Sequence, residues 1–136
     1  MEWEKNSFIV SDDASKLDIE VIYEFLTNSY WGKGRTKELI YESIQNSFSL
    51  GLYLNGKQIG FARAITDYYT FAYLCDVFVL EEFRRKNLGH FLMDCLFKHP
   101  KLNSLKWLLK TTYAQSLYQD FNFKELDSTF GWMLRK

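Results

Sequence analysis

A basic turn that contains one glycine is the strongest chemical signal in the sequence. The ten residues FRRKNLGHFL, Phe83 to Leu92, place three consecutive cations, an Asn and a Gly between the most apolar run of the chain and an apolar stripe. Where a strand ends in such a turn and a helix begins, unpaired backbone N–H groups lie together with the positive end of the helix dipole. This arrangement binds anions, and phosphate groups in particular.

Each residue type in this turn suits a phosphate group. Gly89 allows a ligand to approach the backbone closely, and Asn87 is among the few non-glycine residues that tolerate a left-handed conformation. Arg84, Arg85 and Lys86 add positive charge. The alternative is a solvent-exposed basic turn in which Gly89 serves only close packing of the helix, and the turn alone does not decide between them.

Composition limits the classes of function that the turn can serve. A chain of 136 residues with 47% hydrophobic and 18% aromatic residues predicts one globular domain, residues 1–136, and argues against disorder. Because 17 Lys and Arg balance 17 Asp and Glu, no overall field attracts nucleic acid, and any cationic site must be local.

Cellular location and metal content are predicted from what the sequence lacks. The start, MEWEKNSF, is polar and acidic, and no window approaches the roughly 18 apolar residues of a membrane span, so we expect a cytoplasmic protein without a membrane partner. Cys75 and Cys95 have no CxxC spacing and are read as core residues. His90 and His99 lack metal-ligand spacing, so we predict no metal.

The periodicity of apolar residues predicts the elements that position the turn. Helical spacing indicates helices at 17–26, near 39–44, from 88 to His99-Pro100, and over 114–121. Alternation on either side of Asn55-Gly56 predicts a β-hairpin that begins at Phe48. Further strands are expected at 8–10, 70–80, 105–109 and 131–135. The order of these elements predicts one mixed α/β sheet with the strand, basic turn and helix in its middle.

Two partial motifs in this order resemble the GNAT N-acetyltransferase superfamily, and the resemblance covers most of the chain. The family's turn reads Arg or Gln, two residues, Gly, one residue, Gly or Ala, and here Arg84 to Gly89 match it with Asn87 in place of the first Gly. A later family signature is matched by Ala114, Leu117, Tyr118 and Phe123, with Asn122 where Gly is usual. The resemblance implies the family's acyltransferase fold, a mostly antiparallel sheet with helices on both faces.

The resemblance also implies that acetyl-CoA binds as the acyl donor. Its pyrophosphate would be held by backbone N–H groups of the turn, and its pantetheine arm would pair with the main chain of the preceding strand. The implied binding residues are Val77, Phe78, Val79, Arg84, Arg85, Lys86, Asn87, Leu88, Gly89 and His90.

In such proteins an amine attacks the thioester directly, so the implied catalytic groups act on the carbonyl, the amine proton and the sulfur. By resemblance, a strand N–H near Val77 would polarise the carbonyl and Tyr118 would donate to the sulfur. The alternative for Tyr118 is an aromatic packing residue. Asp76, a lone acid in a buried strand, is the candidate base, and the alternative is a satisfied carboxylate that holds a neighbouring N–H or Tyr.

The acceptor amine is expected near the loop NSYWGKGRT and the turn TDYYT. Tyr30, Trp31, Asp67 and Tyr69 would offer aromatic faces and a carboxylate to a cationic small molecule or peptide amine. Aromatic residues near loops also cover core edges, so this assignment has an alternative as well. The same aromatic residues are also consistent with a homodimer.

Three functions therefore compete. An acetyl-CoA-dependent N-acetyltransferase leads because both motifs occur at the right separation. A non-catalytic acyl-CoA-binding regulatory module is the alternative, motivated by Asn at both usual Gly positions. A nucleic-acid-binding domain is disfavoured by the net charge of zero.

Overall fold

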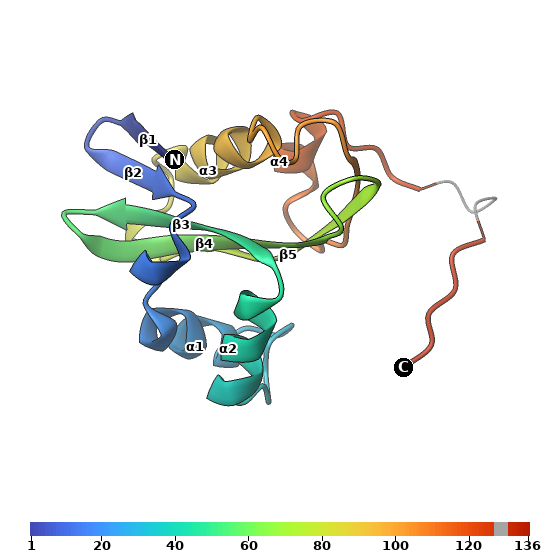
Figure 1. Cartoon of the computed structure of the whole chain (residues 1–136), viewed down its shortest axis with the longest axis horizontal. Helices are drawn as coiled ribbons and strands as arrows, with labels where there is room; N and C mark the ends of the chain where they lie inside the picture. Colours follow the sequence, from blue (N-terminus) through green and yellow to red (C-terminus); the bar gives the residue numbers. More distant parts are fainter. Residues whose placement is uncertain (127–130) are drawn as a thin grey trace.

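A six-stranded sheet forms the centre of the computed structural model, which describes residues 1–126 and 131–136 (Figure 1). The strands follow their sequence order across the sheet, and all neighbours are antiparallel except the last pair, β5 and β6. The strands are β1 (Glu2–Lys5), β2 (Phe8–Ser11), β3 (Phe48–Leu54), β4 (Lys57–Thr66), β5 (Phe71–Val79) and β6 (Lys106–Leu109).

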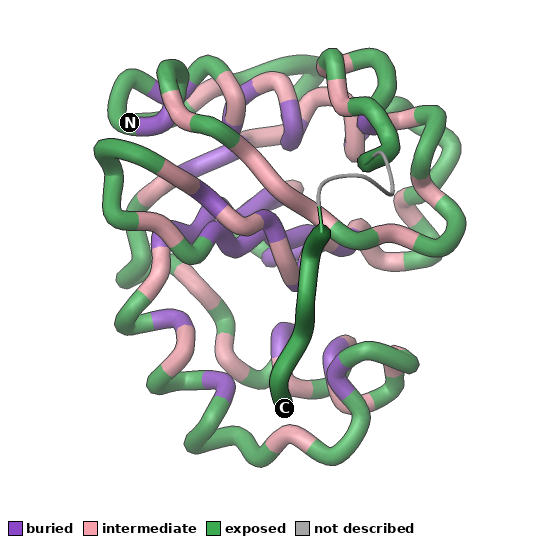
Figure 2. The backbone as a smooth tube through the Cα atoms, turned by 90° about the vertical axis from the view of Figure 1, so that its right-hand side faces the viewer, coloured by how far each residue is buried: buried purple, intermediate pink, exposed green. Residues whose placement is uncertain are grey.

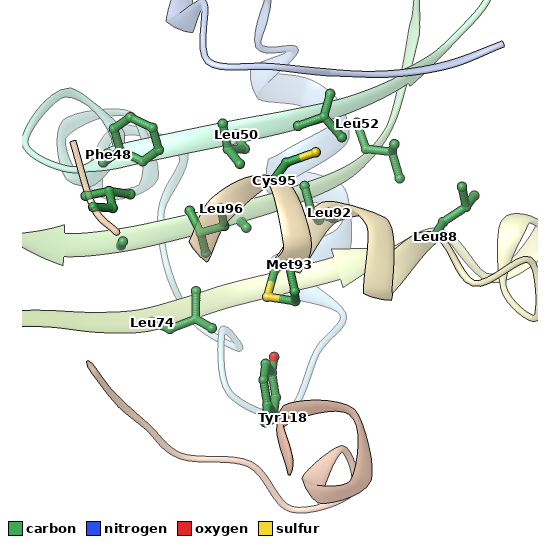
Figure 3. Packing of buried hydrophobic residues seen from close by; sticks show 14 of the residues in the cluster. Phe48, Leu50, Leu52, Leu74, Leu88, Leu92, Met93, Cys95, Leu96 and Tyr118 are labelled. Atoms are coloured by element: carbon green, nitrogen blue, oxygen red, sulfur yellow. The ribbon is translucent and has the colours of Figure 1, made fainter. Parts of the chain in front are cut away.

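Helices cover both faces of the sheet, as the resemblance predicted. Figure 1 shows α3 (Leu88–Phe97) and α4 (Gln115–Gln119) on one face, and α1 (Ile19–Thr27) and α2 (Lys37–Gln45) on the other. Each face buries its own apolar cluster. The larger one joins Leu50 and Leu74 of the sheet to Leu92 and Leu96 of α3 (Figure 3), while Phe61 and Phe78 pack beneath α1 and α2.

Local sequence accounts for the main boundaries. Asn55 and Gly56 take φ values of 51° and 79°, the left-handed pair that a tight hairpin between β3 and β4 requires. The Asp18 side chain accepts hydrogen bonds from the first backbone N–H groups of α1, and Thr36 caps α2 in the same way. Short 3₁₀ turns at Ala14–Lys16 and Glu81–Phe83 complete the connections.

The structure confirms most of the predicted elements and adds one. The four helices, the hairpin and the strands near residues 8–10, 70–80 and 105–109 are present, and their ends shift by no more than three residues. Strand β1 was not predicted, because its polar sequence EWEK has a single apolar residue, Trp3. It pairs with β2 through all four of its residues.

The predicted strand at 131–135 was wrong. Residues 131–136 carry no regular secondary structure, and the Met133 and Leu134 side chains are 95% and 93% exposed. Alternating residues favour an extended backbone, but a strand exists only where its N–H and C=O groups pair with a neighbour. Figure 2 shows this C-terminal segment running in front of the sheet as an exposed tube.

Within the described residues, a break in the sheet leaves the second half of β5 without a paired strand on the β6 side. Their parallel pairing runs from Phe71 opposite Lys106 to Leu74 opposite Leu109 and ends there. At the same level, the pairing of β4 with β5 shifts register, and Asp76 adopts a φ of 54°. A bulge of this kind bends a strand and increases its twist, so the far half of β5 diverges from β6. No helix in the described part of the chain is long and apolar enough to cross a membrane.

Candidate active site

The basic turn after β5 has the backbone geometry of an anion nest. Arg85 and Asn87 take φ values of 65° and 61°, so left-handed residues interrupt the turn twice within three positions. Alternation between left-handed and ordinary conformations points successive backbone N–H groups into one concavity that suits an anion. The prediction that Asn87 tolerates this conformation is confirmed.

The start of α3 adds free donors to the nest. Asn87 occupies the N-cap position, but its side chain makes no capping hydrogen bond, and the Phe91 N–H donates to the Asn87 carbonyl. The N–H groups of Leu88, Gly89 and His90 precede that bond and so have no partner within the helix. A doubly charged group at this point would receive these donors and the helix dipole together.

Gly89 is not required by packing within the chain. A Cβ added there would meet only the Leu117 side chain, at 3.7 Å, which is an ordinary contact. The helix-packing alternative for Gly89 therefore has no support in the structure. Open space at this position is what a site for an external group requires.

The side chains of the turn have separate tasks. Arg84 Nε donates to the Val79 carbonyl at 3.0 Å and so ties the turn to the end of β5. Arg85 and Lys86 are exposed and free to meet a ligand, whereas Leu88 is buried in the core. His90 lies against Phe121, with ring centroids 4.7 Å apart, and so links α3 to the segment after α4.

The open edge of β5 leads directly to this nest. Beyond Leu74, residues 75–79 of β5 have no strand partner on the β6 side within the described chain. Val77 and Val79 pack partly against the larger cluster, and Phe78 stacks on Phe25 on the opposite face, with centroids 4.0 Å apart. An extended ligand along this edge would find unpaired main-chain groups at one end and the anion nest at the other.

Tyr118 of α4 lies beside the same break. Its side chain is 7% exposed and points from α4 toward the strand that carries Leu74 (Figure 3). Burial raises the pKa of the Tyr118 phenol to about 12, so the phenol stays protonated throughout the neutral range. The structure thus offers a buried hydroxyl donor at the divergence of β5 and β6.

Asp76 is held by two arginines. Arg35 Nη1 lies 2.9 and 2.8 Å from its two carboxylate oxygens, and Arg63 Nε lies 2.9 Å from Oδ2. Arg63 also donates to Ser47 Oγ at 2.8 Å. The two guanidinium groups occupy both carboxylate oxygens, which matches the alternative of a satisfied acid and leaves the amine-proton acceptor unassigned.

The four predicted acceptor residues fall into two groups. Tyr30 and Trp31 pack edge to face at 5.1 Å and line a cavity of about 590 Å³ beside residues 80–82 and Arg84, at the carboxyl end of β5. Asp67 and Tyr69 lie in the turn before β5, at its opposite end. There Asp67 accepts hydrogen bonds from the Tyr69, Thr70 and Phe71 N–H groups, and with the Thr70 hydroxyl these bonds lower its pKa.

Sequence reasoning missed two contributors to this region. Arg35 pairs with Asp76 from 41 positions away, and Tyr113, which follows β6 in the chain, meets Tyr30 edge to face at 6.4 Å. Neither belongs to a local motif. For Arg35, the only available signal was the presence of a lone buried acid, which requires a cation somewhere in the fold.

Comparisons with known proteins agree with this geometry. Residues 45–125 match the GNAT acetyltransferase domain family. A structure from Xanthomonas campestris pv. campestris, described as an acetyltransferase of the GNAT family, superposes with a TM-score of 0.92 and 37% identity over 98% of this chain and 95% of that one. A GNAT acetyltransferase from Elizabethkingia anophelis, solved with acetyl-CoA bound, shares the fold at a TM-score of 0.68 with 19% identity, over 90% of this chain and 80% of that one.

One curated relative extends the comparison to a fungus. A Gibberella zeae protein described as an acetyltransferase is 26% identical over 69% of this chain, and the match spans 64% of that protein's length. The family match covers more than half of the 136 residues and includes the strand, the nest and the helix that carries Tyr118. The chain belongs to the GNAT acetyltransferase family.

Proposed function

We propose that this acyltransferase domain uses acetyl-CoA to acetylate a primary amine of a small molecule or peptide. The observation that carries the proposal is the continuous path from the unpaired edge of residues 75–79 to the nest at Arg84–His90. The pantetheine arm of CoA is an extended chain with amide groups, and a diphosphate joins it to the nucleotide. An unpaired strand edge that runs into a helix N-terminus complements both parts in the correct order.

The backbone conformation at the two Asn positions supports the proposal. Asn87 and Asn122, which stand where the family pattern has Gly, take φ values of 61° and 69°. Asn is among the non-glycine residues best suited to this left-handed region, at a cost on the order of 1 kcal/mol. The two replacements therefore keep the backbone shape of both motifs.

In the proposed reaction, the neutral amine attacks the thioester carbon, the carbon–sulfur bond breaks, and the sulfur leaves as a thiolate. A free N–H on the edge of β5 near Val77 would stabilise the carbonyl oxygen as it gains negative charge. Tyr118 would act at the sulfur. With a phenol pKa of about 12 against about 8.5 for a reference thiol, full proton transfer to the thiolate is uphill by roughly 5 kcal/mol. Tyr118 thus serves as a hydrogen-bond donor, and solvent supplies the final proton.

The acceptor is proposed to enter between Tyr30, Trp31 and the end of β5. Glu24, Glu81 and Glu82 join the two aromatic residues around the 590 Å³ cavity. Carboxylates beside aromatic faces favour a cationic amine. The amine proton leaves to water in this scheme, since Asp76 is already paired with two guanidinium groups.

Calorimetric titration with acetyl-CoA, CoA and adenosine diphosphate at fixed salt tests the nest. Gly89→Asp should reduce CoA affinity at least tenfold, because its charge faces the diphosphate, while an acid in the first turn of a helix does not harm the fold. The control variant Gly89→Asn adds a side chain of nearly the same shape as Asp but without its charge. It therefore separates the effect of side-chain volume on CoA affinity from the effect of charge. Equal affinity in wild type and Gly89→Asp would refute the nest, and binding without turnover on an amine panel would favour the regulatory module.

A further inference from the structure

Two arginines share a single carboxylate at the bulge of β5. Arg35 comes from the connection between α1 and α2, Arg63 comes from β4, and both pair with Asp76, whose side chain is 1% exposed. Within residues 1–126 and 131–136, Asp76 is the one carboxylate that pairs with either guanidinium group. Because both guanidinium groups are always charged, one carboxylate can balance only one of them. The cluster therefore carries excess positive charge.

A ligand can reach part of this excess charge through Arg35. The Arg35 side chain is 25% exposed, whereas that of Arg63 is 9% exposed. Arg35 uses Nη1 alone for both of its bonds to Asp76, and its Nε and Nη2 have no hydrogen-bond partner in the described part of the chain. An arginine holds a carboxylate or a phosphate through two parallel N–H bonds from one edge of its planar fork. The Nε–Nη2 edge of Arg35 remains available for such a group.

The same side of the sheet has more hydrogen-bond donors than acceptors. Ser49 of β3 stands opposite Arg63 of β4 in the register, so the two side chains project from the same face. Ser49 is 8% exposed, and its Oγ has no partner among the described residues. Arg63 uses Nε for Asp76 and Nη1 for Ser47. Buried polar groups are normally satisfied, so unmatched donors beside excess charge indicate that an acceptor group from outside the chain completes this region.

We infer that the acceptor amine also carries an anionic group, a carboxylate or a phosphate, which binds the open edge of Arg35. This inference rests on the proposed function, since it concerns the same acceptor. Arg35 contacts Asp76, the residue before Val77, whose N–H is proposed to meet the thioester carbonyl. Trp31, which lines the cavity proposed for the amine, belongs to the same connection between α1 and α2. One connection thus offers an aromatic ring to the cation and a guanidinium group to the anion.

Calorimetric titration of matched amines tests this preference without any turnover. The amines are titrated into the wild-type chain with and without CoA, which has no acetyl group to transfer. The panel pairs each amino acid with its amide, and phosphoethanolamine with ethanolamine, so the members of a pair differ chiefly in negative charge. At least one charged member should bind roughly tenfold or more tightly than its neutral partner, as expected for a hydrogen-bonded ion pair. The two kinds of pair distinguish a carboxylate from a phosphate.

The variant Arg35→Gln assigns the preference to this residue. It should abolish the preference and leave CoA affinity unchanged, because Arg35 lies outside the nest. The fold should persist, since Asp76 and Arg63 remain as a balanced pair. Lys33→Gln removes an exposed positive charge from the same connection and is the matched control, which should keep the preference.

Acetylation of the same panel with acetyl-CoA separates this inference from the proposed function. A preference for charged members without turnover would support the anion site and refute acetyl transfer. Turnover of neutral amines alone would support acetyl transfer and overturn the anion site. Equal or weaker binding of the charged member in every pair, or a preference that survives Arg35→Gln, would also overturn the inference.

Discussion

The Tyr118 hydroxyl combines burial with a position at the break in the sheet. Burial raises its pKa to about 12, so ionisation of this phenol lies outside the range in which the enzyme would be assayed. The same burial makes a hydrogen bond from the phenol stronger, because the local dielectric constant is low. Its contribution to the rate should therefore not vary between pH 6 and 10.

Tyr118→Phe removes only this hydroxyl. Turnover should fall roughly 10- to 100-fold, the value of one hydrogen bond to a charged atom, with unchanged CoA affinity. Steady-state rates on an identified amine and calorimetry of CoA binding measure the two effects. Tyr41→Phe, at an exposed position on α2, is the control and should behave as wild type. A decrease in CoA affinity with unchanged turnover would show that Tyr118 only shapes the binding site.

The pairing of Asp76 predicts a stability effect at a single residue. Asp76→Asn keeps the shape and tolerates the φ of 54°, but it leaves the Arg35 and Arg63 guanidinium groups facing each other without their counter-charge. Loss of one partner from a buried pair costs about 3 kcal/mol or more. Urea unfolding should show this decrease, whereas Glu82→Gln at the exposed turn should change stability by less than about 0.5 kcal/mol. Equal stability of Asp76→Asn and wild type would show that the ion pairs contribute nothing net.

At the scale of elements, the β1–β2 hairpin is attached to the end of α3 by one carboxylate. Asp12 Oδ2 lies 2.9 Å from His99 Nε2, and His99 is buried against Trp3 and Phe48. Partial burial opposes ionisation of Asp12, but hydrogen bonds from the N-terminal amine and His99 outweigh it and lower the Asp12 pKa. The ionised acid thus helps to hold the two elements together.

This lowered pKa predicts acid sensitivity of the hairpin. A depressed folded-state pKa contributes stability that is present above the unfolded value of about 3.9 and is lost as pH falls through the folded value. Wild type should therefore exceed Asp12→Asn in free energy of unfolding at pH 7, and the difference should shrink progressively as pH falls below the unfolded value of about 3.9. Urea titrations at pH 7 and at a series of lower pH values measure the difference. A difference that is independent of pH would assign the effect to packing.

The elements that the sequence predicted correctly are those that residues close together in the chain determine. The hairpin at Asn55-Gly56, the helices and the left-handed Asn87 follow from neighbouring residues, and all are present in the structure. The open edge of β5 was not predicted in detail, because it depends on a bulge at Asp76 and on where pairing with β6 stops. The Arg35–Asp76 pair joins residues 41 positions apart, which no periodicity reveals.

At the scale of the whole molecule, binding of CoA at the proposed nest would link stability to ligand concentration. A ligand that binds only the folded chain raises the melting temperature by mass action, and a hundredfold excess over the dissociation constant adds about 2.7 kcal/mol. Wild-type protein should therefore melt several degrees higher with saturating CoA than without it, by calorimetry or circular dichroism.

The variant Gly89→Asp distinguishes binding at the nest from binding elsewhere. Its melting temperature without CoA should lie near that of wild type, because a Cβ at this position meets only the Leu117 side chain, at 3.7 Å. The same CoA concentration should raise the melting temperature of the variant less, since the added carboxylate repels the diphosphate. An equal rise in both proteins would place CoA at another surface, and no rise in either would mean that the folded chain does not bind it.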